Sequence, residues 1–254
     1  MFRQLRISVL LIILLVVALT TWQTKIRTTD WDSPLWMVVY PINADGSKVS
    51  GSYIQSLSES RFDPIERFLK REAKLYGVSI DQPLTIKLAP QLEALPPTPP
   101  ESRNPLLVAW WSLKMRYWAL THNNYDGPSP DIQMFVLYHD PTKQKQLAHS
   151  LGLEKGLIGV VNAYAGKRMA AQNNIVIAHE MLHTVGATDK YDLATNRPVF
   201  PIGYADPNRA PLHPQAKAEI MAGRVALSES KAVMPRGLKS VIVGETTASE
   251  INWK

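Results

Sequence analysis

Two histidines and a glutamate occur at the spacing H-E-x-x-H, with His179 and His183 four residues apart and Glu180 directly after the first. Residues four apart on a helix lie one turn above the other, so the two imidazoles can face the same point. This is the geometry of a two-histidine zinc clamp. Glu180 lies about 100° around the helix from His179, where it can reach a metal-bound water. The motif therefore predicts a Zn²⁺ cofactor and a general base for hydrolysis.

The residues that follow the motif add a turn and a candidate third ligand. Gly186 can end the helix in a left-handed conformation and return the chain towards the metal. Asp189 comes three residues later and offers a carboxylate oxygen. Asp192, His213 and Glu219 also carry suitable ligand atoms further along the chain. Spacing alone leaves all four open as the third ligand.

The segments around the motif predict a mixed α+β arrangement. Apolar and alternating runs favour strands at residues 35–42, 84–89, 132–138 and 157–165, and a short strand or extended connection at 52–57. Apolar residues at helical spacing favour helices at 63–76, 106–121, 175–185 and 237–253, although β-branched residues weaken the last of these. We expect the tryptophans of 106–121 to pack in the core, because aromatic side chains are mostly buried.

The string from His179 to Asp189 resembles the motif H-E-x-x-H-x-x-G-x-x-H/D of the metzincin metallopeptidases, and it is most similar to the snapalysin-type branch, which has aspartate last. The segment I-M-A-G at 220–223 resembles the Met-turn of the same family. The resemblance implies that Met221 forms an apolar floor below the zinc and that Asp189 is the third ligand. It covers only residues 174–225. The stretch between the two motifs is longer than in a minimal snapalysin-like enzyme, so other loop ligands stay possible.

The resemblance also implies a fold and an activity. The fold is a zincin-like catalytic domain with a mixed, mostly N-terminal sheet, an active-site helix, a Met-turn and a C-terminal helix. The activity is hydrolysis of peptide bonds in peptide or protein substrates by a metal-activated water, with Glu180 as general base. Residues 157–165 are expected to form the edge strand that binds the peptide. Tyr191 and Tyr204 are candidates for stabilising the oxyanion, or are packed tyrosines with one hydrogen-bonded end.

Two other functions are compatible with the sequence. One is a thermolysin-like peptidase in which Glu219 is the third ligand. The other is a non-catalytic zinc-binding envelope protein. Glu180 argues against the second, because a structural zinc site needs no base and normally has a closed shell of four ligands.

The N-terminus predicts a membrane segment. Two arginines precede an apolar run at residues 7–19, and a tryptophan follows it. No small-x-small cleavage pattern comes after the run, which favours a retained anchor over a cleaved signal peptide. We expect residues 1–24 to be a transmembrane anchor or uncleaved signal, 25–34 a linker and 35–254 the metallopeptidase domain. The expected location is the cell membrane, single-pass, with the catalytic domain periplasmic or extracellular.

The composition excludes other classes. The net charge is +6, but four of the 28 basic residues come before the first acid, which leaves 24 against 22 acidic residues. Without a clustered basic face, nucleic-acid binding is not expected. The chain has no cysteine, so disulfides, thiolate metal ligands and a cysteine nucleophile are excluded.

Overall fold

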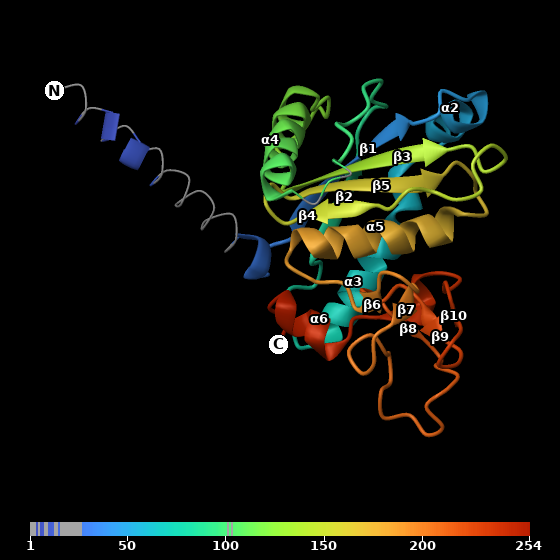
Figure 1. The fold of residues 1–254 in the computed structure, drawn as a ribbon. Coiled ribbons are helices and arrows are strands. Elements are labelled where there is room, and N and C mark those ends of the chain that lie inside the picture. The colour runs from blue at the N-terminus through green and yellow to red at the C-terminus, as the bar shows by residue number, and fades with distance from the viewer. Residues whose placement is uncertain are drawn as a thin grey trace.

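A mixed five-stranded sheet forms the centre of the N-terminal part (Figure 1). The computed structural model describes residues 27–100, 102 and 104–254, and also residues 4, 6, 7, 10–12 and 15. The strands are β1 (Leu35–Asn43), β2 (Leu84–Leu88), β3 (Ile132–His139), β4 (Leu151–Leu153) and β5 (Ile158–Tyr164), in the order β2-β1-β3-β5-β4. All neighbours are parallel except β4, which runs antiparallel to β5. This mostly parallel sheet with its helices is compatible with the predicted α+β class.

Helices cover both faces of the sheet. They are α2 (Lys48–Gln55), α3 (Asp63–Leu75), α4 (Pro105–Thr121), α5 (Ala170–Thr184) and α6 (Glu245–Glu250), with short 3-10 turns at Glu59–Arg61 and Leu238–Ser240. Successive strand residues face opposite sides, so Met37 and Val39 of β1 join a core with α3 and α5. Val38 and Tyr40 join a second core with α4. The sheet is therefore buried on both faces.

The chain after α5 forms a separate layer of loops and short strands. These strands are β6 (Tyr191–Asp192), β7 (Arg197–Pro198), β8 (Ala218–Glu219), β9 (Val225–Ala226), β10 (Ala232–Val233) and β11 (Val241–Ile242), paired as β6-β7, β8-β11 and β9-β10. Figure 1 shows α5 between this layer and the large sheet. One side of α5 thus packs on the sheet and the other faces the C-terminal layer.

Two predicted elements differ from the structure. The segment expected to be extended at 52–57 is mostly helix α2, because Ser47 caps its first turn by accepting a hydrogen bond from the Ser50 backbone N–H at 3.0 Å. The helix expected at 237–253 is divided into a 3-10 turn, strand β11 and the short helix α6. The β-branched pair Val241–Ile242 pairs with β8 instead of continuing a helix.

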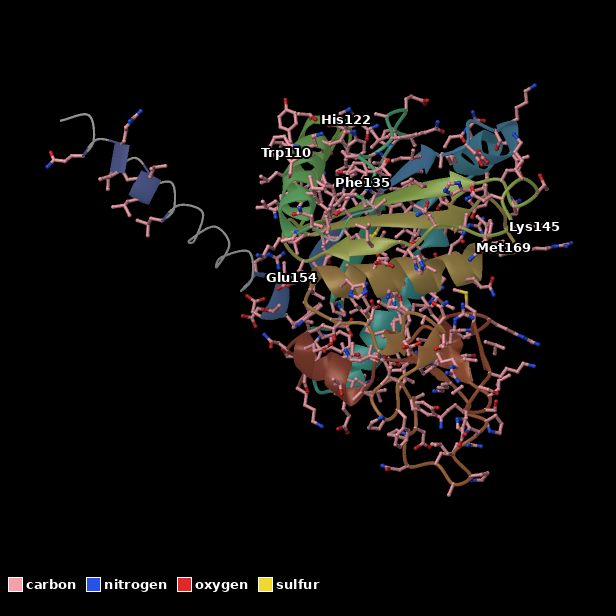
Figure 2. The ribbon with its side chains drawn as sticks, in the orientation of Figure 1. Trp110, His122, Phe135, Lys145, Glu154 and Met169 are labelled. Carbon is pink, nitrogen blue, oxygen red and sulfur yellow. The ribbon has the colours of Figure 1, made fainter. Side chains whose placement is uncertain are left out.

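Helix α4 buries only one side. Trp111, Met115 and Ala119 lie in the core, but Trp110 is 59% exposed and Leu113 is 55% exposed. Figure 2 shows Trp110 on the outer side of α4. The expectation that the tryptophans pack in the core is therefore right only for the side of the helix that reaches the sheet.

The predicted membrane location is corrected. Among the residues that the structure describes, no helix combines the length and the apolar character needed to cross a bilayer. This finding contradicts the single-pass location expected from the N-terminus. Most of the expected anchor, residues 1–24, lies outside the described residues, and its division from the linker and the catalytic domain stays a prediction.

Part of the expected linker is packed against the end of the chain. Trp31 is 3% exposed, and its ring centroid lies 5.5 Å from that of Trp253. Its indole N–H donates to the Ile251 carbonyl at 2.6 Å. Arg27 pairs with Asp131 at 3.1 Å. From Arg27 onwards the chain is therefore held against the folded body.

Candidate metal centre

Helix α5 carries the two motif histidines and ends directly after them. The Ala187 N–H bonds to the Leu182 carbonyl at 3.0 Å, which closes the last turn. Gly186 has φ +108°, a conformation that L side chains rarely adopt, so a glycine is required where the chain reverses. The reversal returns the chain past the end of α5 and places Asp189 opposite the two histidines, as expected from the sequence.

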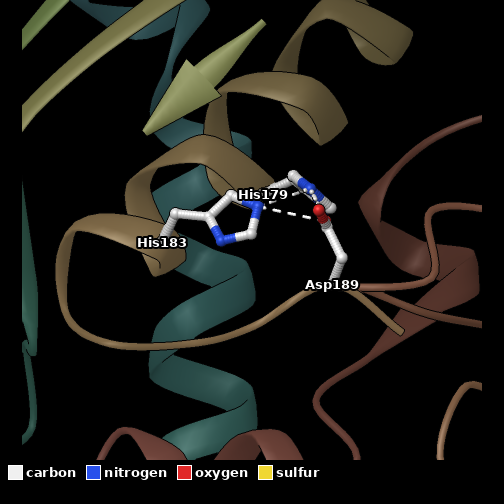
Figure 3. A group of neighbouring side chains, drawn as sticks. All are labelled: His179, His183 and Asp189. Carbon is white, nitrogen blue, oxygen red and sulfur yellow. Dashed lines mark hydrogen bonds and ion pairs between the residues drawn. The ribbon is translucent and has the colours of Figure 1, made fainter. Parts of the chain in front are cut away.

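The side chains of His179, His183 and Asp189 converge on one point (Figure 3). His179 Nε2 lies 3.1 Å from Asp189 Oδ1, and His183 Nε2 lies 3.1 Å from the same oxygen. The two Nε2 atoms are also 3.1 Å apart. Three potential ligand atoms thus form a nearly equilateral triangle.

Backbone carbonyls fix the orientation of both rings. His179 Nδ1 lies 2.9 Å from the Ile220 oxygen, and His183 Nδ1 lies 2.7 Å from the Ala187 oxygen. A carbonyl oxygen can only accept, so in each ring Nδ1 carries the hydrogen and, in the neutral imidazole, Nε2 presents its lone pair. This is the outer-shell arrangement that orients histidines as metal ligands.

The three atoms fit a tetrahedral metal ion. Two lone pairs and a carboxylate oxygen that face one another at 3.1 Å repel unless a proton or a metal cation lies between them. In a tetrahedral zinc site with bonds of about 2.0–2.1 Å, neighbouring ligand atoms are about 3.3 Å apart. Burial by itself raises the pKa of Asp189, yet hydrogen bonds donated by the two imidazoles, when Nε2 carries a proton, hold that pKa well below its ordinary value. The carboxylate is therefore ionised and ready to bind a cation.

The loop that carries Asp189 is held by Glu250 of α6. The Glu250 carboxylate accepts from the Thr188 backbone N–H at 2.9 Å and from the Thr188 hydroxyl at 2.6 Å. It also accepts from Lys190 Nζ at 2.7 Å. Both neighbours of Asp189 in the chain are thus attached to one carboxylate.

Glu180 is buried next to the triangle, with 5% of its surface exposed. Within the described part of the chain, its Oε2 atom has no hydrogen-bond partner. Burial raises the pKa of Glu180, and His179 and His183 oppose this without cancelling it. A carboxylate with a raised pKa and a free lone pair can accept a proton and later return it.

A pocket of about 420 Å³ opens beside Glu180. Its walls come from the segment before β4, from β5, from α5 and from the turn after β8. The residues that line it are Lys145, Gln146, Leu147, Ala148, His149, Ser150, Asn162, Tyr164, Met169, Gln172, Asn173, Ile175, Val176, His179, Glu180, Tyr191, Asn196, Ala222, Gly223, Arg224 and Met234. The pocket gives a bound molecule direct access to both His179 and Glu180.

The predicted Met-turn lies below His179. Met221 is fully buried, and the preceding residue, Ile220, supplies the carbonyl that orients His179. Glu219 holds this turn through its carboxylate, which accepts from the Ala222 N–H at 2.9 Å and from the Thr247 hydroxyl at 2.7 Å. Glu219 is therefore committed to hydrogen bonds within the turn and does not join the triangle.

The other two rival ligands also lie elsewhere. His213 Nε2 lies 3.1 Å from the Tyr204 hydroxyl. Asp192 accepts hydrogen bonds from the Thr195 backbone and side chain in an exposed turn. Of the described residues, the group that could hold a metal ion is made of the two motif histidines and Asp189.

The two candidate tyrosines have different surroundings. Tyr191 lines the pocket, with its ring centroid 6.2 Å from that of His179. Tyr204 packs against Phe200 and does not line the pocket. Tyr191 is therefore placed to contact a molecule bound beside the triangle, and Tyr204 is not.

The strand expected to bind substrate is not at the edge of the sheet. Strand β5 is paired with β3 along its length, and β4 covers residues 158–160 on its other side, so a peptide cannot add along these residues and β5 is not the edge strand that was expected. The edge strand on this side of the sheet is β4, which is too short to be seen in the sequence pattern. A Cβ at Gly152 would overlap the Glu180 carbonyl oxygen and the His183 Cβ, so only glycine lets β4 lie this close to α5.

Sequence reasoning missed two residues of the pocket. His149 lines it and lowers the pKa of Glu180, and Arg224 is also part of its lining. Neither has a spacing that relates it to the histidine motif, so no local signal pointed to it. The Glu250 contacts were missed for the same reason.

No protein-family model and no curated protein matches the sequence.

Proposed function

We propose that the chain is a zinc-dependent peptidase of the metzincin type, with His179, His183 and Asp189 as ligands and Glu180 as general base. The observation that carries the proposal is the 3.1 Å triangle of acceptor atoms beside a buried carboxylate with an unpartnered oxygen. The Met-turn below His179 and the mixed sheet above α5 support the resemblance seen in the sequence.

In the proposed hydrolysis, the metal ion, Glu180 and the pocket each have a separate role. A bound zinc ion would polarise the scissile carbonyl and lower the pKa of a coordinated water towards about 7. Glu180 accepts a proton from the attacking water at its free Oε2 and transfers it to the leaving amine. The wall of the pocket holds the substrate chain against this carboxylate.

Tyr191 is the residue best placed to stabilise the oxyanion. Burial raises the pKa of its phenol, and the nearby carboxylates of Asp189 and Glu180 raise it further. The hydroxyl therefore stays protonated at neutral pH and can donate a hydrogen bond to the negative charge that develops on the carbonyl oxygen.

The two alternative functions are less well supported. A thermolysin-like site would need Glu219 as ligand, but this carboxylate is bonded to Ala222 and Thr247. A structural zinc site would need a fourth protein ligand, and the described residues supply three. Three ligands next to a carboxylate and a pocket are typical of a catalytic site.

A peptide-library assay with the purified, zinc-loaded chain tests the proposal. Wild type should cleave peptides, and a chelator or Glu180→Gln should lower kcat by about 100-fold or more, because the base or the metal is lost. Glu154→Gln is the matched control, since Glu154 is an exposed acid outside the pocket. Cleavage that survives both treatments would reject the mechanism.

A further inference from the structure

The pocket beside Glu180 is lined by cationic groups without matching acids. Lys145 and Arg224 are both part of its lining. Glu180 is the one acidic residue among the described residues that line it. Since Glu180 serves as the proposed base, the two cations have no acidic group of the chain to neutralise them within the pocket.

Arg224 is held in the wall by the turn that precedes it. Gly223, with φ +67°, ends the Met-turn and directs the chain into β9. Arg224 is half-buried at this point and lines the pocket together with Tyr191, whose ring centroid lies 6.2 Å from that of His179.

Several described arginines have side-chain partners, whereas Arg224, which lines the pocket, has none among the described residues. Arg27 pairs with Asp131, Arg71 pairs with Glu72, and Arg197 donates to the Glu229 carbonyl. Within residues 27–100 and 104–254, the structure contains no ion pair or hydrogen bond of the Arg224 side chain. A half-buried guanidinium with free donors is suited to a planar, anionic ligand such as a carboxylate.

The rest of the pocket suits the stem of a side chain. Met169, Ile175, Val176 and Met234 give it an apolar surface, and Gln172 adds an amide. Figure 2 shows Lys145 and Met169 at the same end of α5, so the second cation lies near this apolar surface. A volume of about 420 Å³ admits any amino-acid side chain, and charge rather than size is then the main basis for selection.

We propose that this pocket recognises a carboxylate of the peptide substrate, with Arg224 as the residue that determines specificity. The inference rests on the proposed peptidase function and names the substrate class of the same site. The carboxylate belongs either to an Asp or Glu side chain near the scissile bond or to the free C-terminus of a short peptide. Both sources present the same planar anion to the guanidinium.

Matched peptides test the proposal and separate the two sources. One series moves a single Glu or Gln through otherwise identical peptides, and the other compares free with amidated C-termini. Wild type should cleave the carboxylate member of one series about 10- to 100-fold more efficiently in kcat/KM, as expected for a charge-assisted hydrogen bond. Arg224→Gln should abolish most of this preference, and Arg224→Glu should reverse it in favour of the Gln or amidated member.

Arg209→Gln is the matched control, because Arg209 is exposed and does not line the pocket. This variant should keep the wild-type preference, and zinc content and unfolding temperature should show that each Arg224 variant is folded. Equal cleavage of both members of each pair by wild type, or a preference that persists in Arg224→Gln, would overturn the proposal and leave the peptidase function intact.

Failure of the peptidase function has a different signature. If wild type cleaves no peptide, calorimetry measures whether the zinc-loaded chain binds the carboxylate member of each peptide pair more tightly than the other member. Tighter binding of the carboxylate member, lost in Arg224→Gln, would support carboxylate recognition without hydrolysis. Equal binding of both members would overturn it.

Discussion

Lys190 Nζ lies 2.7 Å from Glu250 Oε2, and this ion pair joins the loop after helix α5 to the C-terminal helix α6. The Lys190 side chain is 1% exposed. Thr188 donates to the same carboxylate through its backbone and its hydroxyl. Because Asp189 lies between these two residues, Glu250 determines where the third candidate ligand is held.

Loss of the Glu250 carboxylate should weaken metal binding. In Glu250→Ala, Lys190 loses its ion-pair partner and the loop around Asp189 loses its hold on α6. Outer-shell changes of this kind typically reduce metal affinity by about 10- to 100-fold. Competition with a chromophoric chelator measures the affinity. Glu245→Ala, an exposed acid of the same helix, is the control, and equal zinc affinity in both variants would contradict the role of Glu250.

The same carboxylate predicts acid sensitivity of the metal-free chain. Burial raises the pKa of Glu250, but the bonds from Lys190 and Thr188 outweigh it and hold the pKa below the ordinary value. Glu250 therefore contributes stability above about pH 4.5, and this contribution is lost as pH falls through its folded pKa. In urea unfolding with chelator present, wild type should be more stable than Glu250→Gln at about pH 7, and the difference should shrink towards about pH 3. A difference independent of pH would refute this.

Removal of the Tyr191 hydroxyl should slow catalysis without releasing the metal. Tyr191→Phe should lower kcat by about 100-fold if the phenol stabilises the oxyanion, while zinc content stays at the wild-type level. Tyr204→Phe is the matched control, because Tyr204 lies outside the pocket and its hydroxyl lies against His213. Steady-state kinetics on one cleaved peptide gives the comparison. Similar kcat values for Tyr191→Phe and wild type would exclude the phenol from the reaction.

The close contact between β4 and α5 should not tolerate a methyl group. Gly152→Ala would force the strand away from the Glu180 carbonyl and the His183 Cβ. Overpacking of this kind costs about 1–3 kcal/mol of unfolding free energy. Gly51→Ala is the control, because its new Cβ would meet only Asn43 Nδ2 at an ordinary 3.5 Å. Denaturant unfolding of both variants measures the cost, and equal stabilities would show that β4 is loosely held.

Elements with strong local patterns could be predicted from the sequence. Strand β1 and helix α3 agree with the predicted ranges to within a residue or so at each end, because their apolar periodicity is sustained over many residues. Strand β4 has three residues, one of them glycine, which is too few for a pattern. Helix α2 was missed because its signal is a serine cap rather than an apolar face.

The candidate site was predictable only where its residues are neighbours in the chain. His179, Glu180 and His183 share one helix, so their spacing was sufficient to group them. Asp189 follows in a short turn, but only the resemblance to the metzincin motif favoured it over the other three candidate ligands. The carbonyl partner of His179 comes from a distant turn, and Glu250 and Arg224 come from distant parts of the chain. Tertiary packing brings these residues to the site, and their spacing in the sequence does not predict these contacts.

Zinc content after dialysis against a low, buffered zinc concentration tests the central assignment most directly. Wild type, Asp192→Ala and His213→Ala should each retain about one zinc ion per chain, as expected for one three-ligand site, whereas Asp189→Ala and His183→Ala should retain little. Circular dichroism would confirm that each variant is folded. Full zinc occupancy in Asp189→Ala, or no bound zinc in wild type, would contradict the site formed by His179, His183 and Asp189.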